Sequence, residues 1–277
     1  MIDLSDRTAI VTGGAMGIGE AIARRFREAG ATVWIADVDE DAGRRVANDI
    51  GDNAIFKSCD VSAESEVRDL VEAARAATGR IDIMVNNAGV GTGYDMVEAV
   101  EETAMDRAYA INQKGVLFGM KHAVAAMRGS GGTIVNISSI AALSGGTSGL
   151  IYTGTKGAVS AMTRSAALHA GGYGIRVNAI APGIILTPIY EANYPPGVAR
   201  KVLTHQAESQ QPLARLGVPA DVANAALWLA SDLSDFVTGQ TIAVDGGYSS
   251  SHRGALEAGF AKLQAELSEL EGAQDDG

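Results

Sequence analysis

The stretch Thr12-Gly13-Gly14-Ala15-Met16-Gly17-Ile18-Gly19 lies between a β-branched apolar run, Thr8–Thr12, and a segment with helical spacing, Gly19–Ala29. Glycine residues permit a sharp strand-to-helix turn and let backbone N–H groups approach a pyrophosphate, which the helix N-terminus attracts. Glycine clusters also occur in ordinary turns, so the strand before and the helix after carry the argument. Together they predict a nucleotide-binding βα unit.

An acidic residue, Asp37, follows the next apolar run, Thr32–Ala36. Its carboxylate can accept hydrogen bonds from ribose hydroxyls and would repel a 2′-phosphate, while Met16 and Val38 supply no cation to attract one. The sequence therefore favours NAD over NADP. The alternative role for Asp37 is a cap for the helix that begins after Val38.

Short apolar runs alternate with helical patterns along most of the chain. This order is typical of a parallel sheet covered by helices on both faces, and nearly continuous apolar strands fit burial on both sides. We expect a single α/β domain with a Rossmann-like, doubly wound, seven-stranded sheet. The further predicted strands are Ala54–Cys59, Ile81–Val85, Gly132–Ile137, Ile175–Ala181 and Thr241–Val244, and the further helices are Ala42–Ile50, Glu64–Thr78, Thr103–Met127, Leu150–Gly171 and Ala220–Ala230.

Two segments stand outside this alternation. Residues 184–217 are polar and contain several prolines, which is typical of a substrate-binding loop or lid. Residues 249–277 form a tail after the catalytic domain, which we place at residues 1–248. In the tail Leu256, Phe260 and Leu263 recur at helical spacing, which predicts an amphipathic helix that must bury its apolar side on this subunit or on a neighbour.

The composition limits the classes of partner. The net charge is −11 and the pI about 4.8, which opposes general binding to nucleic acid or to an anionic membrane. Cys59 is the single cysteine, so no disulfide forms within the chain, as is typical of a cytoplasmic protein. We expect no signal peptide, no membrane span and no metal site, because the four histidines are scattered.

Tyr152 and Lys156 are four residues apart in a predicted helix, and Ser139 lies upstream at the end of a strand. Residues at this spacing share one face of a helix. An ammonium beside a phenol favours the phenolate and lowers the pKa of the phenol, so that it can exchange protons near neutral pH. A serine hydroxyl can hold the substrate oxygen. The set fits reversible proton transfer at an alcohol or ketone.

Polar and small residues also follow the third and fourth strands. Asp60 can accept from an adenine amino group or cap the next turn, and the two roles are compatible. The run Asn86-Asn87-Ala88-Gly89 ends the fourth strand at the edge where α/β sheets bind ligands. The small Ala88 and Gly89 would let the backbone approach a nucleotide, although the run could also be an ordinary turn.

These motifs, taken in order from about Leu4 to Tyr248, resemble the short-chain dehydrogenase/reductase family. The resemblance rests on the glycine stretch, Asp60, the run 86–89, Asn112, Ser139, Tyr152 with Lys156, and the run 178–183. It implies a single NAD(P)-binding domain with its own catalytic residues. The tail is longer than in most members, so the core alone is a poor guide to the substrate.

The resemblance also implies the site residues. Tyr152 would be the general acid/base, Lys156 would lower its pKa and hold the nicotinamide ribose, and Asn112 would hold a water for proton relay. Ile185 and Thr187 would bind the nicotinamide carboxamide. The catalytic residues are then Asn112, Ser139, Tyr152 and Lys156; the substrate-binding residues are Ser139, Ala141, Leu143 and Tyr152; and the cofactor-binding residues are Gly13, Met16, Gly17, Ile18, Gly19, Asp37, Val38, Asp60, Val61, Asn87, Ala88, Gly89, Tyr152, Lys156, Pro182, Gly183, Ile185 and Thr187.

The favoured function is an NAD-dependent oxidoreductase that interconverts a secondary alcohol and its ketone, with a neutral cyclic, aromatic, terpenoid or steroid-like substrate. Two alternatives stay open: a 3-oxoacyl-carrier-protein reductase, which the −11 charge and Asp37 disfavour, and a non-catalytic NAD-binding subunit. Most members of the family are tetramers, so a homotetramer is expected through the two long predicted helices.

Overall fold

The computed structural model describes residues 2–93, 96–145, 148–191 and 197–250. The predicted amphipathic helix of the tail lies outside these residues. A seven-stranded parallel sheet forms the centre, in the order β3-β2-β1-β4-β5-β6-β7, which confirms the predicted single α/β domain. Its strands are β1 (Thr8–Thr12), β2 (Thr32–Asp37), β3 (Ala54–Ser58), β4 (Ile83–Asn86), β5 (Gly132–Ile137), β6 (Ile175–Pro182) and β7 (Thr241–Val244).

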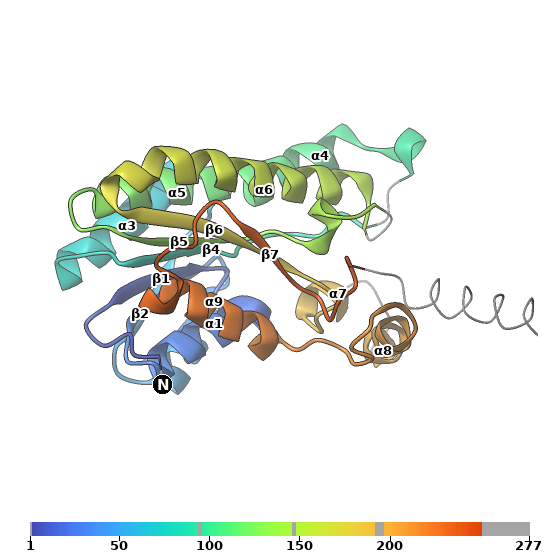
Figure 1. Cartoon of the computed structure of the whole chain (residues 1–277), viewed down its shortest axis with the longest axis horizontal. Coiled ribbons are helices and arrows are strands. Elements are labelled where there is room, and N and C mark those ends of the chain that lie inside the picture. The colour runs from blue at the N-terminus through green and yellow to red at the C-terminus, as the bar shows by residue number, and fades with distance from the viewer. Residues whose placement is uncertain (1, 94–95, 146–147, 192–196, 251–277) are drawn as a thin grey trace, which may run out of the picture.

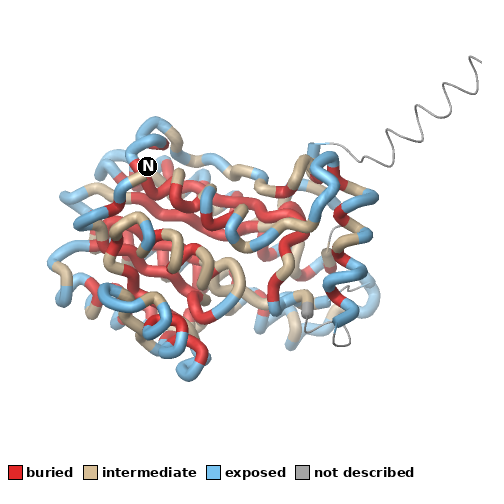
Figure 2. Tube along the Cα trace, turned by 90° about the horizontal axis from the view of Figure 1, so that it is seen from below, coloured by how far each residue is buried: buried red, intermediate tan, exposed pale blue. Residues whose placement is uncertain are grey.

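Helices cover both faces of the sheet (Figure 1). One face packs against helices that share a core cluster with Phe26 and Val46, and the other against helices that share a cluster with Leu70 and Met120. Buried residues run through the middle of the molecule in Figure 2. The first face carries α1 (Gly17–Glu28), α2 (Glu40–Ile50) and α9 (Pro219–Ala230), and the second carries α3 (Glu64–Thr78), α5 (Gly115–Met127) and α6 (Leu150–Ala170).

The single helix predicted over Thr103–Met127 is wrong in detail. The structure has α4 (Glu102–Ala108), a π-helical segment at Tyr109–Lys114, and α5. The buried side chain of Asn112 in this segment exchanges hydrogen bonds with the backbone of Val90, which gives the irregular turn a compensating partner. Such segments often mark functional sites.

Residues 184–217, predicted to be a substrate-binding loop or lid, contain two helices, α7 (Pro188–Glu191) and α8 (Val198–Gln210). In α8, Ala199, Leu203 and Ala207 recur every four residues and are buried. This apolar stripe gives α8 a face to pack, and α7 and α8 lie beyond the end of the sheet (Figure 1).

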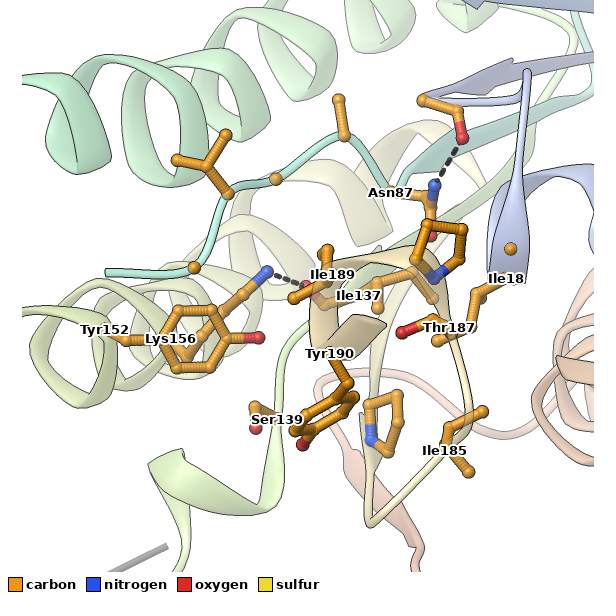
Figure 3. Close-up of a pocket in the computed structure, with 18 of the residues that line it drawn as sticks. Ile18, Asn87, Ile137, Ser139, Tyr152, Lys156, Ile185, Thr187, Ile189 and Tyr190 are labelled. Atoms are coloured by element: carbon orange, nitrogen blue, oxygen red, sulfur yellow. Dashed lines mark hydrogen bonds between the residues drawn. The ribbon is translucent and has the colours of Figure 1, made fainter. Parts of the chain in front are cut away.

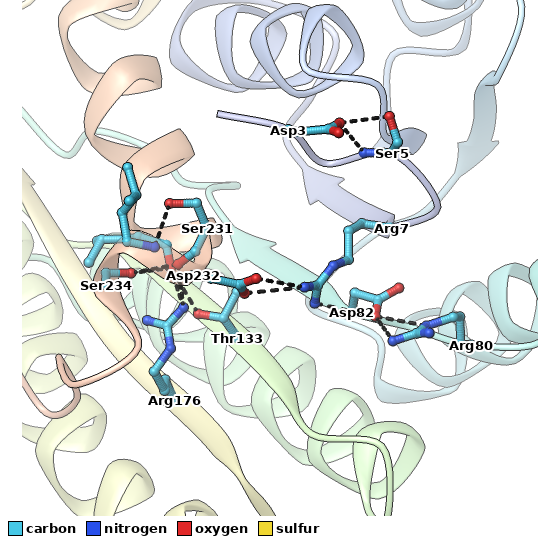
Figure 4. A network of polar contacts seen from close by, with 12 residues as sticks. Asp3, Ser5, Arg7, Arg80, Asp82, Thr133, Arg176, Ser231, Asp232 and Ser234 are labelled. Atoms are coloured by element: carbon cyan, nitrogen blue, oxygen red, sulfur yellow. Dashed lines mark hydrogen bonds and ion pairs between the residues drawn. The ribbon is translucent and has the colours of Figure 1, made fainter. Parts of the chain in front are cut away.

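The amino ends of the central strands are held by a polar network (Figure 4). Asp82 is 1% exposed and accepts from Thr8 N at 2.9 Å and from Arg80 Nε at 2.8 Å. Arg7 lies 3.9 Å from the same carboxylate and also bonds to Asp232 at 3.2 Å. The network ties the start of β1 to the start of β4 and to the end of α9.

The part of the chain that the structure describes has no helix long and apolar enough to cross a membrane.

Candidate active site

The glycine turn between β1 and α1 takes the conformation that its sequence predicts. Gly13 and Gly17 have φ values of 61° and 58°, in the left-handed region that favours glycine. A Cβ on Gly13 would lie 2.8 Å from Ala88 Cα, so a side chain cannot fit there. Asn87 Nδ2 donates to the carbonyls of Thr12 and Gly13, both at 2.9 Å, and clamps the turn against the end of β4.

Asp37 ends β2 beside this turn. Its Oδ2 accepts from Ala15 N at 3.0 Å and its Oδ1 from Asp39 N at 3.1 Å. The cap of α2 is a different residue, Asp39, which accepts from Ala42 N. The alternative role of Asp37 as the side-chain cap of α2 is therefore wrong, and its carboxylate lines a cavity together with Met16 and Val38.

A cavity of about 650 Å³ runs along the carboxyl ends of the strands. It is lined by every predicted cofactor-binding residue except Gly19, where a Cβ would collide with Gly13 O. At one end Asp60 Oδ1 accepts from Ser62 N at 2.9 Å, so Asp60 caps a turn and lines the cavity as well. Cys59 also lines this end, and burial raises the pKa of its thiol to about 12, which keeps it inert.

Ser139, Tyr152 and Lys156 meet at the other end of the cavity. In Figure 3 they lie on one side of the space, while Ile18, Ile185 and Thr187 lie on the other. Tyr152 and Lys156 are one turn apart on α6, and Ser139 follows β5, where its Oγ accepts from Ala141 N at 3.1 Å and caps a short 3-10 turn. The structure thus brings together the three groups that the sequence pattern selected.

The position of Lys156 is fixed from two directions. Its Nζ donates to Ile137 O at 2.9 Å and lies 5.6 Å from the centre of the Tyr152 ring. Its backbone carbonyl accepts from Ser138 Oγ at 3.0 Å, and Ser138 and Ser160 share a further hydrogen bond of 2.8 Å. The end of β5 is therefore bonded both to the side chain and to the backbone of the residue beside Tyr152.

The pKa of Tyr152 is not lowered in this structure, contrary to the sequence-based expectation. Burial raises the pKa of Tyr152 to about 12, because the phenolate loses its hydration, and a hydrogen bond with Ser139 opposes this shift. Burial also lowers the pKa of Lys156 to about 8. The protein alone holds a protonated phenol beside an ammonium that sheds its proton more readily than an exposed lysine.

Asn112 is buried and does not line the cavity. Its Oδ1 accepts from Val90 N at 2.8 Å, and its Nδ2 donates to Val90 O at 2.9 Å and to Thr155 Oγ1 at 3.2 Å. A Cβ on Gly89 would lie 3.1 Å from Asn112 Oδ1 and 3.4 Å from Lys156 Nζ. Asn112 is thus beside Lys156, and the water relay assigned to it stays a prediction.

The segment after β6 forms the wall opposite Tyr152. Gly183 N donates to Val244 O at 3.0 Å, and a Cβ on Gly183 would lie 2.6 Å from Asp245 Cα, so this glycine permits a close approach to the end of β7. Ile185 pairs with Gly217 in an isolated parallel bridge. Ile185 and Thr187 line the cavity, as do Pro182 and Gly183.

The predicted substrate-binding residues are only partly brought together. Ser139 and Tyr152 line the cavity, whereas Ala141 is buried and Leu143 is exposed, and neither lines it. Their role stays a prediction. The wall includes residues that sequence reasoning did not select: Arg107, Tyr190, Leu203, Gln206 and Tyr248.

Helical spacing in the sequence could have identified two of the wall residues that were not predicted. Leu203 and Gln206 are three residues apart, and helical spacing in residues 198–210 would have placed them on one face of a helix. Arg107 and Tyr248 reach the cavity from distant parts of the chain, so no local pattern marks them. Among the described residues, no group of three or more His, Cys, Asp or Glu side chains could hold a metal ion.

Comparisons with known proteins agree on one family. The family model described as enoyl-(acyl carrier protein) reductase matches residues 13–249. The chain is 42% identical to short-chain dehydrogenase reductase ATA1 of Arabidopsis thaliana, over 89% of this chain and 94% of that protein. It is 39% identical to (+)-borneol dehydrogenase 2 of Salvia officinalis, over 90% and 91% of the two chains. It is 40% identical to cis-4-hydroxycyclohexanecarboxylate dehydrogenase of Sinomonas cyclohexanicum, over 88% and 97%.

Proposed function

The chain belongs to the short-chain dehydrogenase/reductase family of oxidoreductases, and on this basis we propose that it oxidises a secondary alcohol on a ring to the ketone with NAD, and reduces the ketone in reverse. The observation that carries the proposal is the meeting of Ser139, Tyr152 and Lys156 at one end of a cavity whose other end holds the glycine turn and Asp37.

The residues along the cavity fit a dinucleotide. The side-chain-free turn at Gly13 and Gly17 leaves room for a pyrophosphate at the start of α1, where the N-cap residue, Met16, makes no side-chain hydrogen bond to the helix. Asp37 would hold the adenosine ribose, and its charge would repel a 2′-phosphate. The cations that line the cavity are Arg107 and Lys156, and the residues beside Asp37, Met16 and Val38, are neutral. This arrangement supports NAD as the cofactor.

Tyr152 is the proposed acid and base. In alcohol oxidation, the Tyr152 phenolate takes the hydroxyl proton, the O–H bond breaks, and the oxygen forms a carbonyl as hydride leaves the carbinol carbon. Bound NAD would accept that hydride, and NADH would return it in the reverse direction. Ser139 would hold the substrate oxygen, and the Lys156 ammonium would stabilise the phenolate.

The raised pKa of Tyr152 has a consequence for direction. At neutral pH the phenol keeps its proton in the protein alone, so it is ready to donate in ketone reduction and must first lose the proton in alcohol oxidation. We therefore expect the rate of oxidation to rise with pH through the neutral and mildly alkaline range.

A ring substrate is supported by the wall beyond Ser139. Ile140, Ile184, Leu203 and Tyr248 form one buried apolar cluster there, with Tyr190 packed against it. The relative from Sinomonas acts, by its name, on cis-4-hydroxycyclohexanecarboxylate, a ring alcohol that also carries a carboxylate. A compact apolar ring would fill such a wall without leaving polar groups unpaired.

The two alternatives have less support. An acyl-carrier substrate needs a basic docking surface, and the net charge of −11 with Asp37 in the cavity disfavours both the acidic carrier and NADP. A non-catalytic subunit would not need Tyr152 and Lys156 held together beside Ser139.

The test is NADH formation by the purified protein with cyclohexanol, substituted cyclohexanols and bicyclic secondary alcohols, with NADP in parallel. We expect turnover of one or more ring alcohols with NAD and at least ten-fold lower kcat/KM with NADP. Tight NAD binding without turnover in either direction would favour the non-catalytic alternative, and a preference for NADP would remove the role of Asp37.

We also propose a homotetramer. Tyr109, Leu117 and Leu168 are exposed large apolar residues on the layer that contains α5 and α6, where a neighbouring subunit could cover them. Light scattering should give four times the chain mass of 28.5 kDa, and a monomer at micromolar concentration would contradict the proposal.

A further inference from the structure

The inner face of α8 forms part of the wall across the cavity from the catalytic residues. Leu203 is 1% exposed and lies in the same buried cluster as Ile140, the residue directly after Ser139. Gln206 is three residues further along α8 and also lines the cavity. Residues at this spacing share a helix face, so the amide of Gln206 lies beside the apolar wall that Leu203 begins.

The three glutamines around the end of α8 differ in their partners. Gln210 Oε1 accepts from Tyr248 Oη at 3.1 Å, and Gln211 Nε2 donates to the carbonyls of Leu213 and Arg215. Within the part of the chain that the structure describes, the side chain of Gln206 makes no such hydrogen bond. Two of the amides hold the lid in place, and the third is open to the cavity.

An open amide in an apolar wall is suited to a substrate with a second polar group. The amide offers a donor and an acceptor, and it carries no charge. A hydroxyl or carbonyl that lost its water beside Leu203 and Tyr248 would need such a partner, because an unpaired buried polar group costs about 1–3 kcal/mol. The charged residues that line the cavity, Asp37, Asp60, Arg107 and Lys156, belong to elements other than α8.

We propose that Gln206 binds a second, neutral hydrogen-bonding group of the substrate, on the side of the ring remote from the reacting carbinol. The substrate class is then a neutral ring alcohol with a further hydroxyl or carbonyl group. This inference rests on the proposed function, because it places the reacting alcohol at Ser139 and Tyr152.

The test compares 1,4-cyclohexanediol with 4-methylcyclohexanol, which replaces the remote hydroxyl by a methyl group of similar size. The variant is Gln206→Leu, which keeps the helix propensity and removes the amide. The wild-type protein should favour the diol in kcat/KM, and the variant should lower the ratio of diol to methyl compound about 3- to 10-fold, the range expected for one neutral hydrogen bond. An unchanged ratio would overturn the proposal.

A matched control separates recognition from damage to the lid. Gln210→Leu removes the hydrogen bond to Tyr248 and should change kcat/KM for both compounds by the same factor, so the ratio stays that of the wild type. If Gln210→Leu moved the ratio as far as Gln206→Leu, the effect would belong to the shape of the lid and the proposal would fail.

A binding measurement keeps the inference apart from the proposed reaction. The dissociation constants of both compounds are measured by calorimetry on the NAD complexes of the wild type and of Gln206→Leu, each with Tyr152→Phe added to prevent turnover. Weaker binding of the diol alone in the Gln206→Leu protein supports the proposal even if the wild type oxidises neither compound. Equal loss for both compounds, or no binding of either, contradicts it.

Discussion

At the amino end of the sheet, the buried carboxylate of Asp82 is met by two arginines and a backbone N–H, whereas at the carboxyl end the buried ammonium of Lys156 meets one carbonyl and the face of a phenol. Both groups are almost fully buried, at 1% and 3% exposure. Figure 4 shows Arg7 and Arg80 beside the first group, the carboxylate of Asp82.

The two groups show that a buried charge can serve either the stability of the fold or the chemistry of a site. A buried charge that is paired and hydrogen-bonded holds elements together, and removal of one partner leaves the others uncompensated. A buried charge without a counterion costs stability, which a protein tolerates where the charge acts on a substrate or a neighbouring group. Asp82 is the first case and Lys156 the second, so substitutions at the two ends should have opposite effects.

The largest effect is expected from Lys156→Met. Loss of the ammonium beside Tyr152 should lower kcat by about 10²–10⁴-fold, the range of general acid–base assistance. The free energy of unfolding at neutral pH should rise, because an uncompensated buried charge is removed. Initial rates and urea unfolding measure both quantities. Lys121→Met, at an exposed lysine, is the control. A Lys156→Met protein that keeps the wild-type kcat would contradict the chemical role of the Lys156 ammonium.

The opposite pattern is expected from Asp82→Asn. The change removes the charge that pairs with Arg80 and Arg7 and should lower the free energy of unfolding by about 2–3 kcal/mol. The kcat per folded molecule should stay within about two-fold of wild type, because the network is remote from the cavity. Asp69→Asn, which breaks an exposed pair with Arg68, should cost less than about 1 kcal/mol. An equal loss of unfolding free energy in Asp82→Asn and Asp69→Asn would show that the buried network stabilises the fold no more than an exposed ion pair does.

A smaller effect is expected from Asp37→Asn, at a carboxylate of the carboxyl end that accepts only from backbone N–H groups. Loss of its charge should reduce the preference of kcat/KM for NAD over NADP about ten-fold, with little change in stability. Asp41→Asn, on the exposed side of α2, should leave the preference unchanged. A preference unaffected by Asp37→Asn would remove the argument for NAD.

The last expected effect is a pH dependence of stability. The pKa of Lys156 is lowered from 10.5 to about 8 on folding, so between these values the unfolded chain binds more protons than the folded one. This group therefore makes the wild type more stable as pH rises from 8 towards 10.5, and Lys156→Met lacks that rise. The stability difference between the two proteins should shrink over pH 8–10 in thermal unfolding, and a constant difference would contradict the shift.

The parts of the site that sequence predicts are those fixed by local geometry. Gly13, Gly17 and Asp37 follow from one strand, one turn and the next strand, and Tyr152 and Lys156 from one helical turn. The alternation of apolar runs and helices was enough to predict the parallel sheet, because the apolar residues within each segment indicate which of its faces are buried.

The rest depends on contacts between distant segments. The direction of the Tyr152 pKa shift follows from burial by elements that the sequence does not place around it, so the expected lowering was wrong for the protein alone. Asn112, in the π-helical segment, bonds to the backbone of Val90, and Gln206 and Tyr248 line one cavity from distant parts of the chain. No local sequence pattern predicts contacts between segments that are so far apart in the chain.

The most direct test of the account is the kcat of Tyr152→Phe in alcohol oxidation with NAD, measured beside its free energy of unfolding and against Tyr173→Phe, at an exposed tyrosine. We expect Tyr152→Phe to lower kcat by about 10³-fold or more, while NAD binding and stability stay close to wild type, and Tyr173→Phe to change none of the three. A Tyr152→Phe protein that turns over within about three-fold of wild type would contradict the claim that the carboxyl end of the sheet carries this chemistry.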